Sequence, residues 1–194
     1  MKKQLKISYN SPVVLSFVFI CFGVMLLGLI TGGGSTNLLF TTYHSSLVNP
    51  LTYIRLFTHV FGHRGWSHFI ANASYLLLLG PLLEEKYGSQ MLIEIIAATA
   101  FVTGIVNYIF FWNVGLCGAS GVVFAFILLS SFTAFNEGEI PLTFILVAVI
   151  YIGQQVIEGI VISDNVSNMA HIVGGLVGAA VGYLLNKKPK HGIG

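Results

Sequence analysis

Charged residues are scarce in this chain. Only 8% of its 194 residues are Asp, Glu, Lys or Arg, whereas soluble domains carry about 25%. So little charge cannot cover a surface that faces water, and 55% of the residues are hydrophobic. The composition therefore predicts an integral membrane protein. The formal net charge of +2 is too small to indicate a nucleic-acid partner.

Cysteine is also rare, and the common metal-binding patterns are missing. Cys21 and Cys117 lie in or beside apolar runs, which argues against a disulfide framework. No cysteine or histidine cluster has the spacing of a structural zinc site, and the HExxH motif of zinc proteases is absent. His59 and His63 are four residues apart, but packing within a loop is the preferred interpretation because a metal site needs more ligands.

What the chain has instead is a series of long apolar runs. A helix needs roughly 17 to 25 largely apolar residues to cross the hydrocarbon core of a bilayer. The runs are continuous and lack the two-residue alternation of barrel strands, so helices are expected. Six candidate spans are present, over residues 12–30, 68–83, 90–112, 115–135, 141–159 and 166–185. The sequence therefore predicts an all-α membrane protein with a single domain over residues 1–194.

The distribution of basic residues predicts the orientation, because lysine and arginine concentrate on the cytoplasmic side. Arg55 and Arg64 fall on one side of a six-span chain, and seven lysines fall on the other. These are Lys2, Lys3, Lys6, Lys86, Lys187, Lys188 and Lys190. We therefore expect both termini in the cytoplasm of a protein of the plasma membrane. A cleaved signal peptide is the alternative for the first run, but the run is long for one and lacks a clear A-x-A site.

The connection over residues 31–67 is unusually long, since most loops have about 4 to 6 residues. It contains apolar and aromatic stretches such as "LTYIRLFTHVFGH". A segment of this composition is too apolar to be a freely solvated loop. We expect it to fold against the outer bilayer face and the helix bundle, and long ordered loops are often functional.

Several polar residues lie within the apolar runs, where polar groups are costly and need a partner or a purpose. His68 and Asn72 are four residues apart, on one face of the second span and in its outer half. Ser120 is expected about one and a half turns below the outer end of the fourth span, roughly 8 Å at 1.5 Å per residue. His171 is expected at a similar depth in the sixth. Four polar side chains from three segments should therefore share one level.

Small residues indicate which helices pack closely. The sixth run has a glycine at every fourth position, Gly174, Gly178 and Gly182, which is the small-xxx-small pattern of close helix pairs. The fourth run offers an equally small surface, formed by Gly118, Gly121 and Ala125. Packing of these two faces would bring His171 beside Ser120.

A serine in a membrane helix usually bonds to its own helix or bridges two helices, so Ser120 alone indicates little. A neutral histidine within reach changes this, because it can take the serine proton during attack on a carbonyl. The acidic residues Glu94, Glu158 and Asp164 are expected near the membrane surfaces, so the simplest scheme is a Ser–His dyad without an acid. His68 and Asn72 fit either an oxyanion hole or an ordinary interhelical hydrogen bond.

Together these segments resemble the rhomboid family of intramembrane serine proteases. The resemblance extends over about residues 55–182, and its motifs occur in the family's order. They are "RLFTH", "HRGWSHFIAN", "GPLLEEKYGS", "GASG" and "AHIVGGLVG". Each motif is weak by itself, whereas the ordered set is specific.

The resemblance implies a six-helix rhomboid bundle whose long first loop is partly embedded in the membrane. It implies that Ser120 is the nucleophile and His171 the general base, with an oxyanion hole formed by His68, Asn72 and the backbone N–H of Ser120. The active-site neighbours are Gly118, Gly121 and Phe124, and many relatives have a tyrosine at the last position. Arg55 and Glu84 match structural polar positions, and the fifth span with the following "EGIVISDNVSN" corresponds to a gate and cap.

The implied activity is the hydrolysis of transmembrane protein substrates within membrane lipid. A helical substrate must unwind to present a peptide bond, so single-span proteins with a helix-weak segment are expected. No metal, nucleotide or redox cofactor is expected. The alternative function is that of a non-proteolytic rhomboid-like protein that binds membrane clients. A small transporter is disfavoured because the sequence shows no inverted repeats.

Overall fold

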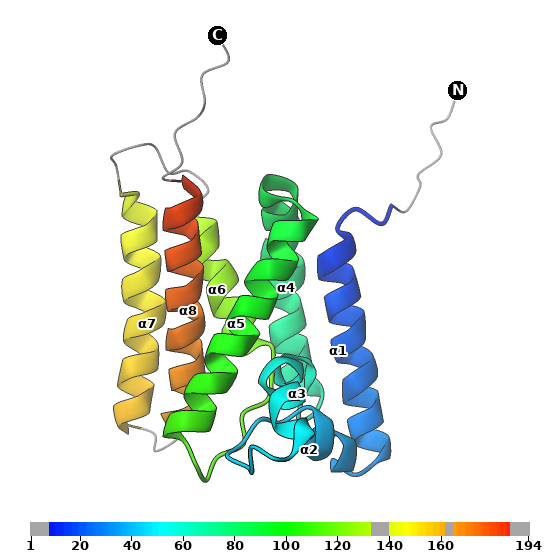
Figure 1. Cartoon of the computed structure of the whole chain (residues 1–194). Helices are drawn as coiled ribbons and strands as arrows, with labels where there is room; N and C mark the ends of the chain where they lie inside the picture. The colour runs from blue at the N-terminus through cyan, green and yellow to red at the C-terminus, as the bar shows by residue number, and fades with distance from the viewer. Residues whose placement is uncertain (1–7, 133–139, 162–164, 187–194) are drawn as a thin grey trace, which may run out of the picture.

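The computed structural model describes residues 8–132, 140–161 and 165–186, and most of these residues lie in helices. Six helices form the bundle (Figure 1). They are α1 (Pro12–Ile30), α4 (Trp66–Tyr87), α5 (Ser89–Phe110), α6 (Ser120–Ser131), α7 (Leu142–Val161) and α8 (Asn165–Asn186). Short helices α2 (Gly34–Leu39) and α3 (Pro50–Thr58), with the 3₁₀ turn η1 (His59–Phe61), lie between α1 and α4.

Three helices of the described part are long and apolar enough to cross a membrane. They are α1, α5 and the Asn168–Leu185 part of α8, while α6 and Leu142–Gln154 of α7 are shorter apolar helices. The chain is therefore an integral membrane protein. Each of the six predicted runs overlaps one bundle helix, and the first has the same bounds as α1. The count of six membrane spans stays a prediction.

The predicted orientation can be compared with the structure only in part, because six of its seven lysines, at positions 2, 3, 6, 187, 188 and 190, lie outside the described residues. Lys86 lies in the last turn of α4. Arg55 lies on α3, toward the other end of the bundle (Figure 1). Lys86 and Arg55 are thus separated along the bundle, and the orientation itself stays a prediction.

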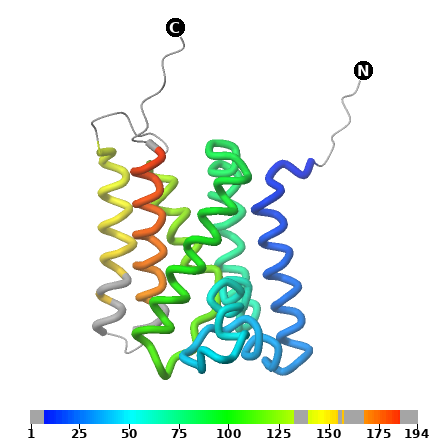
Figure 2. The backbone as a smooth tube through the Cα atoms, in the orientation of Figure 1, coloured from blue at the N-terminus to red at the C-terminus, as the bar shows by residue number. Residues whose placement is uncertain are grey.

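The predicted start of the fourth run at residue 115 is wrong, because α6 begins at Ser120. Leu116 is held in an extended pairing with Thr42, in which each backbone N–H donates to the other's carbonyl at 2.9 Å. Gly118 has a φ of 130°, which no helical residue adopts. The run's predicted end at residue 135 lies outside the described residues. Ser120 is therefore preceded by a non-helical segment and not by helical turns, and Figure 2 shows this segment running into the bundle before α6 begins. The depth of Ser120 in the membrane stays a prediction.

The long connection between α1 and α4 is folded and anchored by a buried arginine. Arg55 is only 2% exposed. Its Nε donates to the carbonyl of Leu38 at 2.7 Å, and its guanidinium carbon lies 4.5 Å from the centre of the Tyr43 ring. A cation over an aromatic face is favourable, the more so when desolvated. The guanidinium thus joins α3 to the end of α2 and to the segment after it, in agreement with the structural role that the resemblance implies.

A buried carboxylate joins the ends of three helices. The two oxygens of Glu84, on α4, accept hydrogen bonds from the backbone N–H groups of Val13 and Val14 at 3.0 and 3.1 Å. Ser89, at the start of α5, donates its hydroxyl to the same carboxylate at 2.7 Å. N–H groups in the first turn of a helix lack partners within it, and negative charge there is favourable. Glu84 thus satisfies the start of α1.

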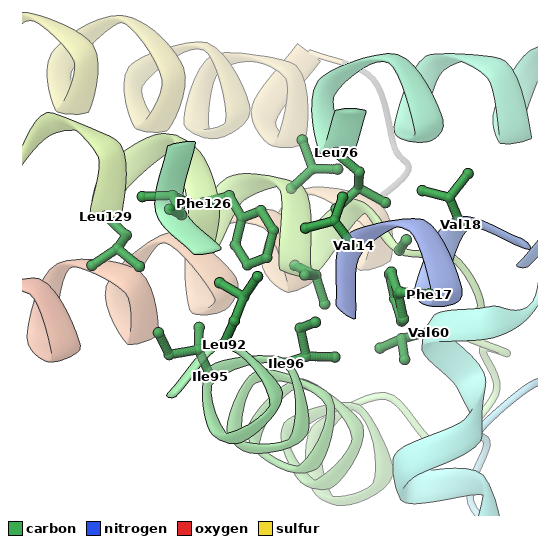
Figure 3. Packing of buried hydrophobic residues seen from close by; sticks show 14 of the residues in the cluster. Val14, Phe17, Val18, Val60, Leu76, Leu92, Ile95, Ile96, Phe126 and Leu129 are labelled. Atoms are coloured by element: carbon green, nitrogen blue, oxygen red, sulfur yellow. The ribbon is translucent and has the colours of Figure 1, made fainter. Parts of the chain in front are cut away.

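The core lies where α1, α4, α5 and α6 meet, and Figure 3 shows their side chains around Phe126. Phe126 and Leu76 are 1% exposed and Leu92 is fully buried. Because lipid tails are as apolar as these side chains, the close fit of the helices contributes more to their association than removal from water does.

Candidate active site

The glycines of α8 pack directly against α6. A Cβ on Gly174 would lie 2.9 Å from the Cα of Gly121 and would overlap the carbonyl oxygen of that residue. A Cβ on Gly178 would lie 2.7 Å from the Cα of Ala125. Such distances leave no room for a side chain, so the predicted close packing of these two helices is confirmed. Gly118 is the exception, because it precedes α6 and does not belong to this surface.

Ser120 is the first residue of α6 and is half-buried. Gly121, which follows it, lies between two other helices: a Cβ there would be 3.2 Å from Cγ2 of Thr103 on α5 and 3.5 Å from the carbonyl oxygen of Ala170 on α8. The backbone next to Ser120 therefore packs between α5 and α8. His171 directly follows Ala170 on α8, so it lies near this contact.

The ring of His171 stacks on Phe124. The ring centres are 4.4 Å apart and the planes are 3° from parallel. Phe124 lies four residues after Ser120, so the two side chains lie on the same face of α6. Tyr151 of α7 contacts the same phenylalanine edge-on, with ring centres 6.0 Å apart. The imidazole is thus placed beside the first turn of α6, while its contact with the Ser120 hydroxyl stays a prediction.

His68 borders the approach to Ser120 from the α4 side. A Cβ on Gly118 would lie 2.7 Å from Nε2 of His68 and 3.9 Å from Oγ of Ser120. The position of a Cβ on residue 118 is therefore close to both the His68 imidazole and the Ser120 hydroxyl. Because that point would be the Cβ of any other residue, only glycine fits at position 118. Its φ of 130° excludes other residues for a second reason.

Asn72 lies one turn after His68 and is 6% exposed. Its Nδ2 donates to the carbonyl of His68 at 3.0 Å, which is a bond within its own helix. This contact is neither the interhelical bond nor the oxyanion contact considered from the sequence. An amide nitrogen carries two hydrogens, so one donor is left for another acceptor.

The loop before Ser120 is held by residues whose part in the site the sequence did not indicate. The carbonyl of His59 accepts the N–H of Gly118 at 2.9 Å. Asn107 donates to the carbonyls of Thr42 and Val114, both at 3.2 Å. These bonds fix the strand-like segment that ends at the serine. Since all three acceptors are backbone carbonyls, the sequence pattern did not indicate these partners.

The imidazole of His59 is engaged within the protein. Its Nδ1 is 3.1 Å from the carbonyl of Arg55 and its Nε2 is 3.2 Å from the hydroxyl of Thr103. Burial lowers the pKa of His59 from 6.5 to about 4, so the ring is neutral and donates from Nδ1 to the carbonyl. The helix breaks at Gly62, so the spacing of His59 and His63 does not place them on one helical face. His63 instead packs beside His68, with ring centres 5.0 Å apart.

The proposed gate and cap are only partly described. α7 is present, but residues 162–164, which include Asp164, lie outside the described residues, as do the side chains of Glu158 and of residues 165–167. Asn168, near the start of α8, is 8% exposed. Among the described residues, no group of three or more His, Cys, Asp or Glu side chains is arranged to hold a metal ion.

Comparison with known proteins gives one consistent result. The Rhomboid domain model matches residues 50–188. Rhomboid protease GluP of Bacillus subtilis is 28% identical over 189 residues, which cover 91% of this chain and 36% of GluP. Rhomboid-like protein 11, chloroplastic, of Arabidopsis thaliana is 26% identical over 146 residues, covering 68% of this chain and 52% of that protein.

A third relative is Rhomboid protease GlpG of Yersinia pestis, which is 25% identical over 181 residues, covering 91% of this chain and 63% of GlpG. The chain therefore spans less than two thirds of the length of each of these relatives.

Proposed function

Because the chain belongs to the rhomboid family, we propose that it is an intramembrane serine endopeptidase that cleaves transmembrane proteins near the outer membrane face. Ser120 is the nucleophile and His171 the general base. The observation that carries this proposal is the stacking of His171 on Phe124, four residues from Ser120, at the place where α8 contacts α6 most closely.

The reaction follows from these roles. Oγ of Ser120 attacks the substrate carbonyl as the neutral imidazole of His171 takes its proton, and an oxyanion forms. The imidazolium then gives this proton to the departing amine, which leaves an acyl-enzyme. Water, deprotonated by the same imidazole, hydrolyses the acyl-enzyme and restores the serine. The dyad therefore needs no acid at the depth of the serine.

In this proposal the oxyanion is stabilised by the backbone N–H of Ser120 and by the side chains of His68 and Asn72. Backbone N–H groups in the first turn of a helix have no carbonyl partner within that helix, and the helix dipole favours negative charge there. Ser120 supplies such an N–H. His68 supplies a ring donor, and Asn72 supplies the amide hydrogen that its bond to the His68 carbonyl does not use. Each donor of this kind contributes about 10²- to 10³-fold to rate.

The substrates are single-span membrane proteins with a helix-weak segment near the outer face, because a stable helix hides its carbonyls in hydrogen bonds. The protein lies in the plasma membrane with both termini in the cytoplasm. The site therefore opens toward the outer aqueous phase, from which the hydrolytic water comes.

Cleavage of a single-span reporter by the purified protein in vesicles tests the proposal. Wild type should cleave, whereas Ser120→Ala and His171→Ala should lose cleavage by about 10³-fold or more. Ser130→Ala is the matched control, because that hydroxyl lies on the same helix and bonds to the carbonyl of Ile127. A fluorophosphonate should label every variant that retains Ser120 and an intact site. Equal cleavage by wild type and the two dyad variants would refute the Ser120–His171 dyad. Absence of cleavage by wild type would leave client binding without proteolysis as the function.

A further inference from the structure

A polar cleft lies beside the loop that leads to Ser120. It has a volume of about 430 Å³. Its walls come from α2 and the segment after it, from the loop after α5 and from Arg64 just before α4. Figure 2 shows the segment after α2 and the loop after α5 side by side, and the Thr42–Leu116 pairing joins them. The polar side chains that line it are Asn37, Thr41, Tyr43, Arg64 and Asn113. The cleft therefore offers hydrogen-bond donors around one positive charge.

Arg64 is the cation of this cleft. Its side chain is exposed, and its Nη2 lies 3.4 Å from the point that a Cβ on Gly115 would occupy. The guanidinium also borders the thiol of Cys117, three residues before Ser120. The charge thus lies against the backbone of the segment that ends at the nucleophile.

No carboxylate of the described residues neutralises this charge at close range. The residues that line the cleft include no Asp or Glu. Glu84 and Glu85 lie in the last turn of α4 and Glu94 near the start of α5, at the end of the bundle away from α2 and α3 (Figure 1). The described structure therefore leaves Arg64 available for an external anion. A guanidinium binds a carboxylate through a charge-assisted and often bidentate pair of hydrogen bonds.

We propose that the Arg64 cleft binds the carboxylate of an acidic substrate residue and so determines which transmembrane proteins are cleaved. This inference rests on the proposed protease function. Five residues lead from Gly115 to Ser120, so these two positions are at most about 18 Å apart. An extended peptide covers that distance with about five residues. The acidic residue therefore lies within about five residues of the scissile bond.

The test uses reporters that differ in one residue. A single-span reporter with a neutral cleavage segment carries Asp, Asn or Lys at each position within about five residues of the scissile bond. We expect wild type to prefer Asp over Asn by about tenfold in kcat/KM at one or two positions, the effect of a charge-assisted hydrogen bond. Arg64→Gln should abolish this ratio, and Arg64→Glu should transfer the preference to Lys.

Controls separate recognition from folding. Lys86→Gln removes a cation at the far end of the bundle and should keep the Asp preference. Fluorophosphonate labelling of Ser120 shows that each Arg64 variant retains an assembled site. If wild type cleaves Asp and Asn reporters equally at every position, or if Arg64→Gln slows both equally, the inference is overturned while the protease function stands. If no reporter is cleaved better by wild type than by Ser120→Ala, both fail.

A lipid phosphate is the other anion that could reach the cleft, and the vesicle composition distinguishes it. The assay is run in phosphatidylcholine vesicles with and without phosphatidylglycerol. An Asp preference that persists in both supports substrate recognition. An effect of Arg64→Gln that depends on phosphatidylglycerol and not on the reporter would assign the cleft to a lipid headgroup and overturn the proposal.

Discussion

Replacing Gly174 by alanine should separate the two helices that carry the proposed dyad. The new Cβ would lie 2.8 Å from the carbonyl carbon of Gly121 and still closer to its oxygen, whereas ordinary contacts begin at 3.4 Å. Both neighbours are backbone atoms, so no side chain can rotate away. Relief of the overlap requires α8 to move by about 1 Å relative to α6, and overpacking of this kind costs about 1–3 kcal/mol.

The same displacement should also lower the rate of catalysis. Displacement of a reacting group by about 1 Å can lower the rate about 10²-fold. Gly174→Ala should therefore reduce kcat/KM for the reporter by about that factor and lower the melting temperature in detergent. The matched control is Gly23→Ala on α1, where a Cβ would meet nothing within 4 Å. This control should keep activity and melting temperature close to wild type.

Two results would refute this reasoning. Wild-type kcat/KM in Gly174→Ala would show that the close approach of α6 and α8 does not position the dyad. Equal losses in Gly174→Ala and Gly23→Ala would show that glycine flexibility, and not the contact with Gly121, is what the site needs.

Gly118→Ala should abolish cleavage, because its Cβ would lie 2.7 Å from the His68 ring and its φ is 130°. Gly65→Ala is also strained, at φ 109°, but its Cβ would lie in open space, so this variant should lower stability alone. Reporter cleavage and melting curves together distinguish the two variants. Glu84→Gln weakens the charged cap of α1 and should lower the free energy of unfolding in detergent by about 1–2 kcal/mol. A melting curve like that of wild type would show that Glu84 does not stabilise the start of α1. Burial lowers the pKa of His59 from 6.5 to about 4, so the unfolded chain binds more protons between these values. His59 should therefore contribute a fall in stability of at most about 3 kcal/mol as the pH drops from 6.5 to 4, and His59→Gln should remove this contribution from melting curves recorded across that range. Burial also lowers the pKa of His63 to about 4, so the contribution of His63 should persist in this variant.

The features predicted correctly from the sequence depend on residues that lie close together in the chain. The first apolar run has the bounds of α1 because a proline begins the helix and the composition changes at its end. The glycines of the last run predicted the contact with the fourth because small residues permit close approach wherever they recur on one face. Arg55 and Glu84 were assigned structural roles by resemblance, and their hydrogen bonds agree with those roles.

The amino-acid sequence by itself determined that this is a helical membrane protein, that α6 and α8 can approach closely, and which hydroxyl and imidazole they carry. Only the tertiary structure decided where α6 begins, because Thr42 pairs with Leu116 and the His59 carbonyl holds Gly118. It alone also placed Arg64 against that segment. The contacts of Thr42 with Leu116 and of His59 with Gly118 join backbone groups far apart in the chain. Every residue has such groups, so only the folded chain selects which of them meet.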